Sequence, residues 1–93
     1  MKTIVTVTHI SPSHLDVRVG IRSTRVDGEA NIGRTLAPYF VYSDSIRQWL
    51  PPHEQDPLSA EDNKAILDAI CLYLEQKGMA YVVNPTDDQY RTL

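Results

Sequence analysis

"SAEDNKAILDAICLYLEQKG", residues 59–78, has the pattern of a single amphipathic helix, and this helix decides the fold class. Ser59 is a typical N-cap, Asp62 stands three positions on as in a partial capping box, and Gly78 is a typical residue to end the helix. One apolar stripe recurs at helical spacing and consists of Ile66, Leu67, Ile70 and Leu74. A stripe of this kind must be buried against another layer of structure.

The other layer is predicted to be a sheet, because strand-like segments both precede and follow the helix. These segments are residues 2–10, 14–21, 23–26, 29–32, 39–42 and 79–83. Apolar and more polar residues alternate strictly over residues 14–21, which predicts an antiparallel strand with one solvent-exposed face. Asp27-Gly28 is a hairpin signal and predicts a turn between residues 23–26 and 29–32. The expected sheet side of the core consists of Val17, Val19, Ile21, Phe40 or Val41, and Val82.

The order of elements, β-β-β-β-loop-α-β, predicts an α+β fold. We expect a small two-layer domain with a mainly antiparallel sheet and one helix packed on one face. The 93 residues suit a single domain over residues 1–85, followed by a polar C-terminal tail at residues 86–93.

Composition favours a cytoplasmic protein without a membrane segment. The net charge is −3 and the arginines are scattered, which argues against a nucleic-acid partner. The single cysteine, Cys71, cannot form an intrachain disulfide, and its place beside the apolar stripe indicates a structural thiol. No apolar run approaches the roughly 20 residues that a membrane helix needs.

Residue types with catalytic chemistry do not combine into a recognisable motif. His53-Glu54 begins like the helical zinc-protease motif, but Pro57 stands where the second histidine is required. His9 and His14 flank a turn, and no cysteine or acid completes a metal site with them. Gly-rich phosphate loops and dinucleotide fingerprints are absent from the sequence. We therefore expect no enzyme activity, no catalytic residues, no metal and no cofactor.

Two surfaces leave other interpretations open. Arg18, Arg22 and Arg25 could form a phosphate-reading stripe with His14, although the interleaved acids favour an ordinary solvated sheet face. A second helix stripe consists of Ala65, Ala69 and Leu72. Together with the strand edges of a small sheet, that stripe predicts a homodimeric structural or regulatory binding module as an alternative function. A small nucleic-acid-binding protein is the weaker alternative.

Residues 43–57 form an irregular segment that contains the only tryptophan, Trp49, and three of the six prolines. Trp49 could close the open end of the core, with Pro51-Pro52 fixing the exit of the loop. It could also be an aromatic anchor rimmed by polar groups, as in a protein-binding hot spot. The predicted partner-binding residues are Asp44, Arg47, Trp49, Glu54 and Asp56.

A short aromatic strand, the motif S-I-x-x-W-x-P-P, an acidic spacer, a Ser-capped helix and a closing strand follow one another over residues 39–83. This arrangement resembles a family of predicted immunity proteins from bacterial polymorphic toxin systems. The resemblance is carried by Trp49, Pro51, Pro52, Glu54, Ser59, and Glu61 or Asp62.

The resemblance implies a non-enzymatic antidote that binds a cognate toxin protein inside the producing bacterium and neutralises it. Many toxins of such systems are basic nucleases, and acidic groups on an inhibitor would then steer the association. The sequence does not name the toxin.

Overall fold

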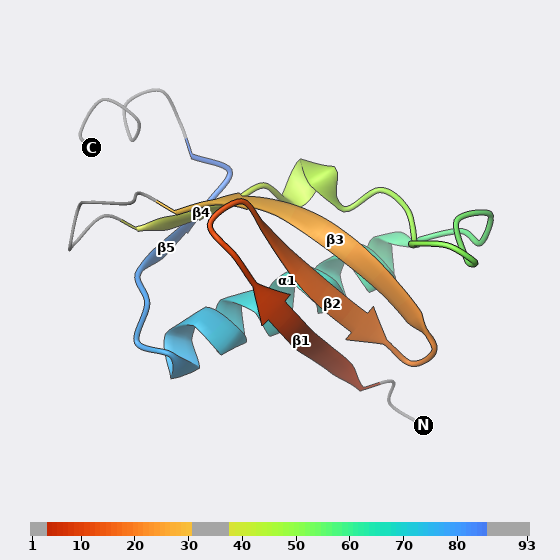
Figure 1. The fold of residues 1–93 in the computed structure, drawn as a ribbon, viewed down its shortest axis with the longest axis horizontal. Coiled ribbons are helices and arrows are strands. Elements are labelled where there is room, and N and C mark those ends of the chain that lie inside the picture. Colours follow the sequence, from red (N-terminus) through yellow and green to blue (C-terminus); the bar gives the residue numbers. More distant parts are fainter. Residues whose placement is uncertain (1–3, 31–37, 86–93) are drawn as a thin grey trace.

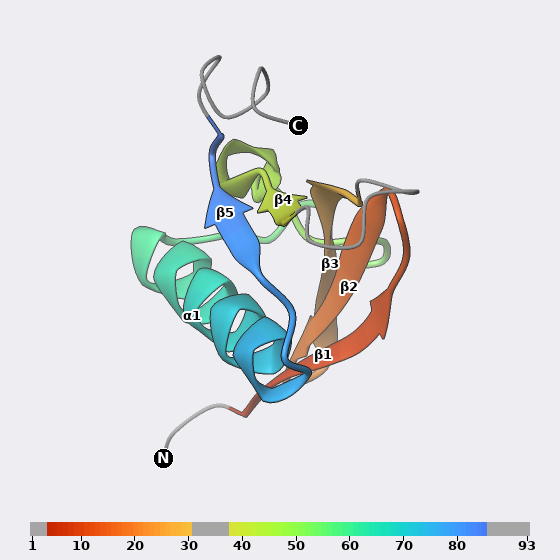
Figure 2. The ribbon, with the colours of Figure 1, turned by 90° about the vertical axis from the view of Figure 1, so that its left-hand side faces the viewer.

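The computed structural model describes residues 4–30 and 38–85, and these residues form a five-stranded sheet with one α-helix against it. In chain order the elements are β1 (Val5–Ile10), β2 (His14–Val19), β3 (Arg22–Glu29), β4 (Tyr39–Val41), the 3-10 helix η1 (Ser43–Ser45), α1 (Ala60–Gln76) and β5 (Tyr81–Val83). Figure 1 shows the curved β1–β2–β3 meander, and Figure 2 shows α1 on one side of the sheet. The predicted α+β domain is confirmed.

The strands follow one another across the sheet in the order β1-β2-β3-β4-β5. The first three pairs are antiparallel, whereas β4 and β5 are parallel. Parallel neighbours need a long crossover connection, and the segment that contains α1 supplies it. The mainly antiparallel character of the sheet is therefore confirmed.

The helix begins and ends where its capping residues predict. The Ser59 hydroxyl accepts the Asp62 N–H, and an Asp62 carboxylate oxygen accepts the Ser59 N–H, both at 3.0 Å. The shorter aspartate thus completes a capping box that usually holds a glutamate. At the other end Gly78 adopts a φ of 69°, a left-handed conformation that glycine accepts without strain.

The predicted turn at Asp27-Gly28 is wrong, because β3 continues through both residues. His14 of β2 pairs with Asp27, and Gly28 continues the pairing with β4. The β2–β3 turn lies at Gly20-Ile21, where Gly20 has a φ of 62°. Ile21 is consequently 77% exposed in that turn, and its predicted place in the core is also wrong.

Gly28 is required by packing and not by a turn. Among the described residues, positive-φ glycines are Gly20 and Gly78, and Gly28 is not one of them. A Cβ atom at Gly28 would overlap the ring of Tyr39, which is 3% exposed. The Tyr39 hydroxyl donates to the Ser11 carbonyl at 3.0 Å, so the ring is held in place over the glycine. Residues 31–32 of the predicted hairpin, residues 1–3 and the predicted tail at 86–93 lie outside the described residues.

The core lies between α1 and the inner face of the sheet. Its members, each at most 4% exposed, are Leu15, Val17, Val26, Tyr39, Val41, Ile46, Trp49, Ile66, Ile70 and Leu74. Each aliphatic side chain buried in this way contributes about 1.5–3 kcal/mol. Of the predicted sheet members, Val17 and Val41 are confirmed, while Val19 and Val82 are half-buried. Phe40 is fully buried outside this cluster, because alternation along β4 points it to the other face.

Candidate partner-binding surface

Residues 43–58, which we name the Trp49 loop, run along the edge of β3 and are fixed to it. The Leu50 N–H donates to the Ser23 carbonyl at 2.7 Å. The Thr24 hydroxyl, 1% exposed, donates to the Gln48 carbonyl at 2.9 Å. Among the described residues, β4 pairs with only the last two residues of β3, so the loop supplies hydrogen-bond partners farther along that edge. A strand edge covered in this way is protected from unspecific pairing.

Trp49 holds this loop from the inside. Its indole is 1% exposed and packs in the core, and Nε1 donates to the Pro57 carbonyl at 3.2 Å. The Arg22 guanidinium carbon lies 5.9 Å from the centre of the ring, within the range of a cation–π contact. The interpretation of Trp49 as an exposed anchor is therefore corrected: in this conformation the indole closes the core and supports the loop surface from beneath.

Asp56 is also engaged within the protein. Its carboxylate accepts Arg22 Nε at 2.9 Å and lies 3.4 Å from His53 Nδ1. Asn63 of α1 donates from Nδ2 to the Ile46 carbonyl at 3.1 Å, which fixes the other part of the loop to the helix. The Trp49 loop is thus attached to β3 by an ion pair and to α1 by a hydrogen bond.

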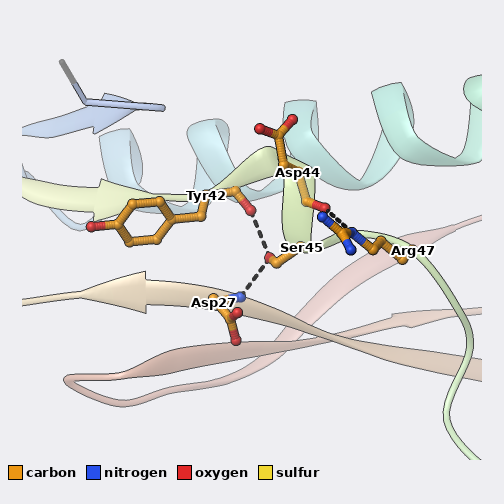
Figure 3. A pocket seen from close by; sticks show the side chains of 5 residues that line it. All are labelled: Asp27, Tyr42, Asp44, Ser45 and Arg47. Atoms are coloured by element: carbon orange, nitrogen blue, oxygen red, sulfur yellow. Dashed lines mark hydrogen bonds between the residues drawn. The ribbon is translucent and has the colours of Figure 1, made fainter.

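An open hollow of about 570 Å³ lies where η1 meets β3, and five residues line it: Asp27, Tyr42, Asp44, Ser45 and Arg47 (Figure 3). The Ser45 hydroxyl donates to the Tyr42 carbonyl at 2.6 Å and accepts the Asp27 N–H at 2.8 Å. Arg47 Nε donates to the Asp44 carbonyl at 2.7 Å. These hydrogen bonds hold the backbone of η1 and the Nε atom of Arg47 in fixed positions.

The side-chain charges of this hollow remain available. Within residues 4–30 and 38–85, the carboxylates of Asp27 and Asp44 have no hydrogen bond or ion pair. Figure 3 shows the two carboxylates pointing in different directions, so they do not form an acid/base pair. The Tyr42 ring extends away from the other four residues (Figure 3), and its hydroxyl donates to Glu29 at 2.8 Å. The arrangement suits binding of cationic groups and not proton transfer.

The predicted partner-binding residues therefore separate into three positions. Asp44 and Arg47 lie together at the hollow, while Trp49 lies beneath the loop. Glu54 is exposed in the turn at residues 51–56, where Asp56 is half-buried. Figure 1 shows this turn projecting well away from η1. The five residues do not form one continuous site.

Three residues of the hollow are not predicted from the sequence: Asp27, Tyr42 and Ser45. The local turn preference of Asp27-Gly28 predicts a hairpin turn there, and a turn at Asp27 would not place it beside η1. The pattern D-S-I-R after an aromatic strand is compatible with a short 3-10 turn, but it does not indicate that this turn packs on β3.

The predicted arginine stripe is not formed. Arg22 pairs in register with Val19, whose side chain faces the core, so Arg22 lies on the opposite face from Arg18. Arg18 Nε donates to the Gly20 carbonyl at 2.9 Å, and Arg25 Nε donates to Asp16 at 3.0 Å. The ordinary solvated sheet face is the interpretation that these contacts favour.

Ser11, His14 and Asp16 lie close together, but their contacts are those of the β1–β2 turn. The Ser11 hydroxyl accepts the His14 N–H at 3.2 Å and contacts His14 Nδ1 at 3.0 Å. Asp16 lies 3.9 Å from His14 Nε2, beyond hydrogen-bond distance, and its other oxygen accepts Arg25 Nε. The His9 and His14 rings lie 5.8 Å apart. The described residues contain no group of three or more His, Cys, Asp or Glu side chains placed to hold a metal.

Cys71 lies half-buried on α1, beside Tyr81 and Glu75. Burial is the largest of the causes that raise the pKa of its thiol. The Tyr81 hydroxyl donates to Glu75 at 2.6 Å, and this hydrogen bond is the main cause that raises the pKa of Tyr81. A thiol with a raised pKa is mostly protonated and a poor nucleophile. These contacts favour the structural role predicted for Cys71.

The protein is a small α+β domain in which the Trp49 loop is hydrogen-bonded along the edge of β3. The family model of Immunity protein 74 matches residues 5–84. The chain therefore belongs to the Immunity protein 74 family, and the match extends the resemblance seen at residues 39–83 to the N-terminal strands. Comparisons with curated proteins and with solved structures give no match. In the part of the chain that the structure describes, no helix is long and apolar enough to cross a membrane.

Proposed function

We propose that this protein is a bacterial antidote that binds a cognate toxin and neutralises it without catalysis. The toxin would belong to a polymorphic toxin system, and the antidote would act in the cytoplasm of the producing cell. The observation that carries the proposal is membership of the Immunity protein 74 family over residues 5–84. An immunity protein acts on a toxin, so we infer that the Trp49 loop binds a protein partner.

We place the contact surface on the Trp49 loop, centred on Asp44 and Arg47. Both residues are exposed, and their backbone is fixed by the contacts of η1 with β3. A loop already ordered in the free protein loses little conformational entropy on binding, which favours affinity. Glu54 is a separate contact point in the projecting turn at residues 51–56, while Trp49 and Asp56 hold the loop from within.

The charge of this surface suits a basic partner. The unpaired carboxylates of Asp27 and Asp44 can accept hydrogen bonds from lysine or arginine side chains. The net charge of −3 adds long-range attraction toward a basic protein and raises the association rate. Steering of this kind should weaken at high salt, because the Debye length falls to about 3 Å at 1 M ionic strength.

A pull-down from the source bacterium with tagged protein, followed by mass spectrometry, tests the function itself. We expect one dominant partner whose isolated toxic domain is inhibited by the purified antidote. Recovery of no specific partner under conditions in which the toxin is expressed would overturn the antidote function.

A charge-reversal pair then tests the placement of the surface. Asp44→Arg reverses an unpaired acid of the hollow, and Asp68→Arg makes the same charge change on an exposed part of α1, where the side chain is 65% exposed. We expect Asp44→Arg to weaken toxin binding by about tenfold or more, and Asp68→Arg by about twofold at most. Equal losses for both variants would mean that only overall charge matters, and would refute this placement.

A further inference from the structure

The turn at residues 51–56, which we name the projecting turn, extends from the body of the protein and is joined to it at a neck (Figure 1). Trp49 and Pro57 flank the turn, and the indole Nε1 donates to the Pro57 carbonyl at 3.2 Å. Because the indole is itself buried in the core, the neck is held from inside. The neck fixes where the turn begins and ends, but it does not fix the direction in which the turn points.

Contacts inside the projecting turn give it a shape without attaching it to the sheet. The His53 N–H donates to the Leu50 carbonyl at 3.0 Å, and the Asp56 N–H donates to the His53 carbonyl at 2.9 Å. His53 Nδ1 also lies 3.4 Å from the Asp56 carboxylate. All of these groups belong to the loop itself, so none of them ties the turn to a strand.

Arg22, the first residue of β3, supplies that attachment. Its Nε donates to the Asp56 carboxylate at 2.9 Å, and its guanidinium carbon lies 5.9 Å from the centre of the Trp49 ring. In the described part of the chain, no other hydrogen bond or ion pair joins the projecting turn to a residue outside the Trp49 loop. The described core cluster also includes no residue of the projecting turn. One side chain of the sheet therefore holds the direction of the whole turn.

The projecting turn carries groups that a partner can contact. Pro51, Pro52, Glu54 and Gln55 are exposed. The Glu54 carboxylate makes no hydrogen bond or ion pair with any residue that the structure describes, so it can accept one from a basic group of a partner. A turn that is oriented before the partner arrives loses less conformational entropy on binding.

We propose that Arg22 is a positioning residue of the partner-binding surface. Acting through Asp56, it holds the projecting turn, and with it Glu54, in the orientation in which a basic group of the partner meets the Glu54 carboxylate. This proposal rests on the proposed antidote function, because it gives the turn a role in contact with the toxin. The positioning itself is a property of the free chain and can be measured there.

The attachment is strong enough to orient the turn and weak enough to be removed without unfolding the domain. The side chains of Arg22 and Asp56 are 43% and 37% exposed, so solvent screens their attraction. An exposed ion pair and a cation–π contact together shift an equilibrium by about tenfold. Removing Arg22 should change the equilibrium between the held and the released turn by that factor.

Hydrogen exchange of the free full chain, read by NMR at the His53 and Asp56 amides, tests the positioning. Arg22→Met removes the charge and the guanidinium but keeps a long side chain. Arg25→Met is the matched control, because Arg25 Nε donates to Asp16 at 3.0 Å from the same strand and does not touch the Trp49 loop. We expect the two amides to exchange about tenfold faster in Arg22→Met and within about twofold of the wild type in Arg25→Met.

Two results of this measurement would overturn the proposal. Unchanged exchange in a folded Arg22→Met protein means that the turn is held without Arg22. An equal increase at the Tyr42 amide, which donates to the Asp27 carbonyl within the sheet, means that Arg22 stabilises the whole fold and does not position the turn.

A second variant tests whether Arg22 acts through Asp56. Asp56→Asn should reproduce most of the increase in exchange, and the double variant should stay within about twofold of Arg22→Met, because both substitutions break one contact. Full additivity of the two effects would contradict this route. Circular dichroism verifies that each protein is folded, and Asp56→Asn decides the result if Arg22→Met does not fold.

Titration with the isolated toxic domain recovered in the pull-down tests the link to binding. Only molecules whose turn is in place bind fully, so Arg22→Met should lower the affinity about threefold or more and Arg25→Met by less than about twofold. Wild-type affinity of Arg22→Met, beside a loss for Asp44→Arg, would refute the role of the turn and leave the antidote function standing. Failure of that function shows differently, as a toxic domain that the wild-type protein does not inhibit.

Discussion

Replacing Gly28 with alanine should destabilise the protein far more than the same substitution at an unobstructed glycine in a strand. The added Cβ atom would overlap the Tyr39 ring, which is buried and hydrogen-bonded to the Ser11 carbonyl. The ring cannot move aside without losing core contacts, and the backbone of β3 cannot move without disturbing its pairing with β2 and β4. The substitution therefore tests whether packing or turn geometry selects the glycine.

The cost has two main components. Overpacking of a well-packed core costs typically about 1–3 kcal/mol. Displacing Tyr39 also weakens its hydrogen bond to Ser11, worth about 1 kcal/mol. Alanine restricts the unfolded chain and returns about 0.4–1 kcal/mol. The net loss in the free energy of unfolding should be about 2–3 kcal/mol, a large share of the roughly 5–15 kcal/mol typical of a domain.

Urea unfolding followed by circular dichroism measures this loss, and two further variants identify its cause. Gly78→Ala is the control, because Gly78 has a φ of 69° and open space around it, so that only about 1–2 kcal/mol of backbone strain is expected. Tyr39→Leu removes the ring, and Gly28→Ala in that background should cost at least about 1 kcal/mol less than in the wild type. Strict additivity of the two substitutions would refute the packing explanation.

If a hairpin turn selected Gly28, the substitution Gly28→Asn would have little effect on stability. Asparagine tolerates positive φ, so Gly28→Asn would be mild if residues 27–28 formed a hairpin turn. In the observed fold the larger side chain should be at least as harmful as alanine.

Two other predictions concern Trp49 and Tyr39. Trp49→Ala should lower the free energy of unfolding by about 3–5 kcal/mol, because the indole is 1% exposed. Trp49→Phe should lower it by less. If urea titrations show a loss below about 1 kcal/mol for Trp49→Ala, the burial of the indole is contradicted. Burial raises the pKa of Tyr39 from 10.0 to about 12. The neutral phenol therefore stabilises the fold fully below pH 10, and the free energy of unfolding should fall by on the order of 2 kcal/mol as the pH rises through this window. Urea titrations across that range should show less of this decrease in Tyr39→Phe, and an identical pH dependence in both proteins would disprove the assignment.

The helix was predictable because its determinants are local. Ser59, Asp62 and Gly78 act on backbone groups within a few residues of themselves, and the apolar stripe needs only helical spacing to be recognised. The Asp27-Gly28 turn was predicted wrongly for the opposite reason. Asp-Gly has a strong local turn preference, but the conformation of Gly28 depends on Tyr39, 11 positions away in the chain (39 − 28), and no short-range pattern reports that contact.

The candidate surface was predictable only in part, for a related reason. A tryptophan among prolines and charges suits both a buried support and an exposed anchor, and the choice depends on packing within the core cluster, which the local sequence does not report. Exposed polar residues such as Asp44 and Arg47 could be selected from the sequence, whereas Asp27 joins them only because the β3 strand passes beneath η1.

The contacts of the Trp49 loop explain how a small protein can present an irregular segment as a rigid surface. A free loop of this length would lose about 0.5–1.5 kcal/mol for each side chain that becomes ordered on binding. Here Arg47 Nε is already bonded to the Asp44 carbonyl, and the Thr24 hydroxyl holds Gln48 from inside the core. The loop also supplies hydrogen-bond partners to the part of β3 that β4 does not pair with. The same contacts therefore protect the exposed part of β3 from nonspecific pairing and hold the charged residues of the loop in place for the proposed partner.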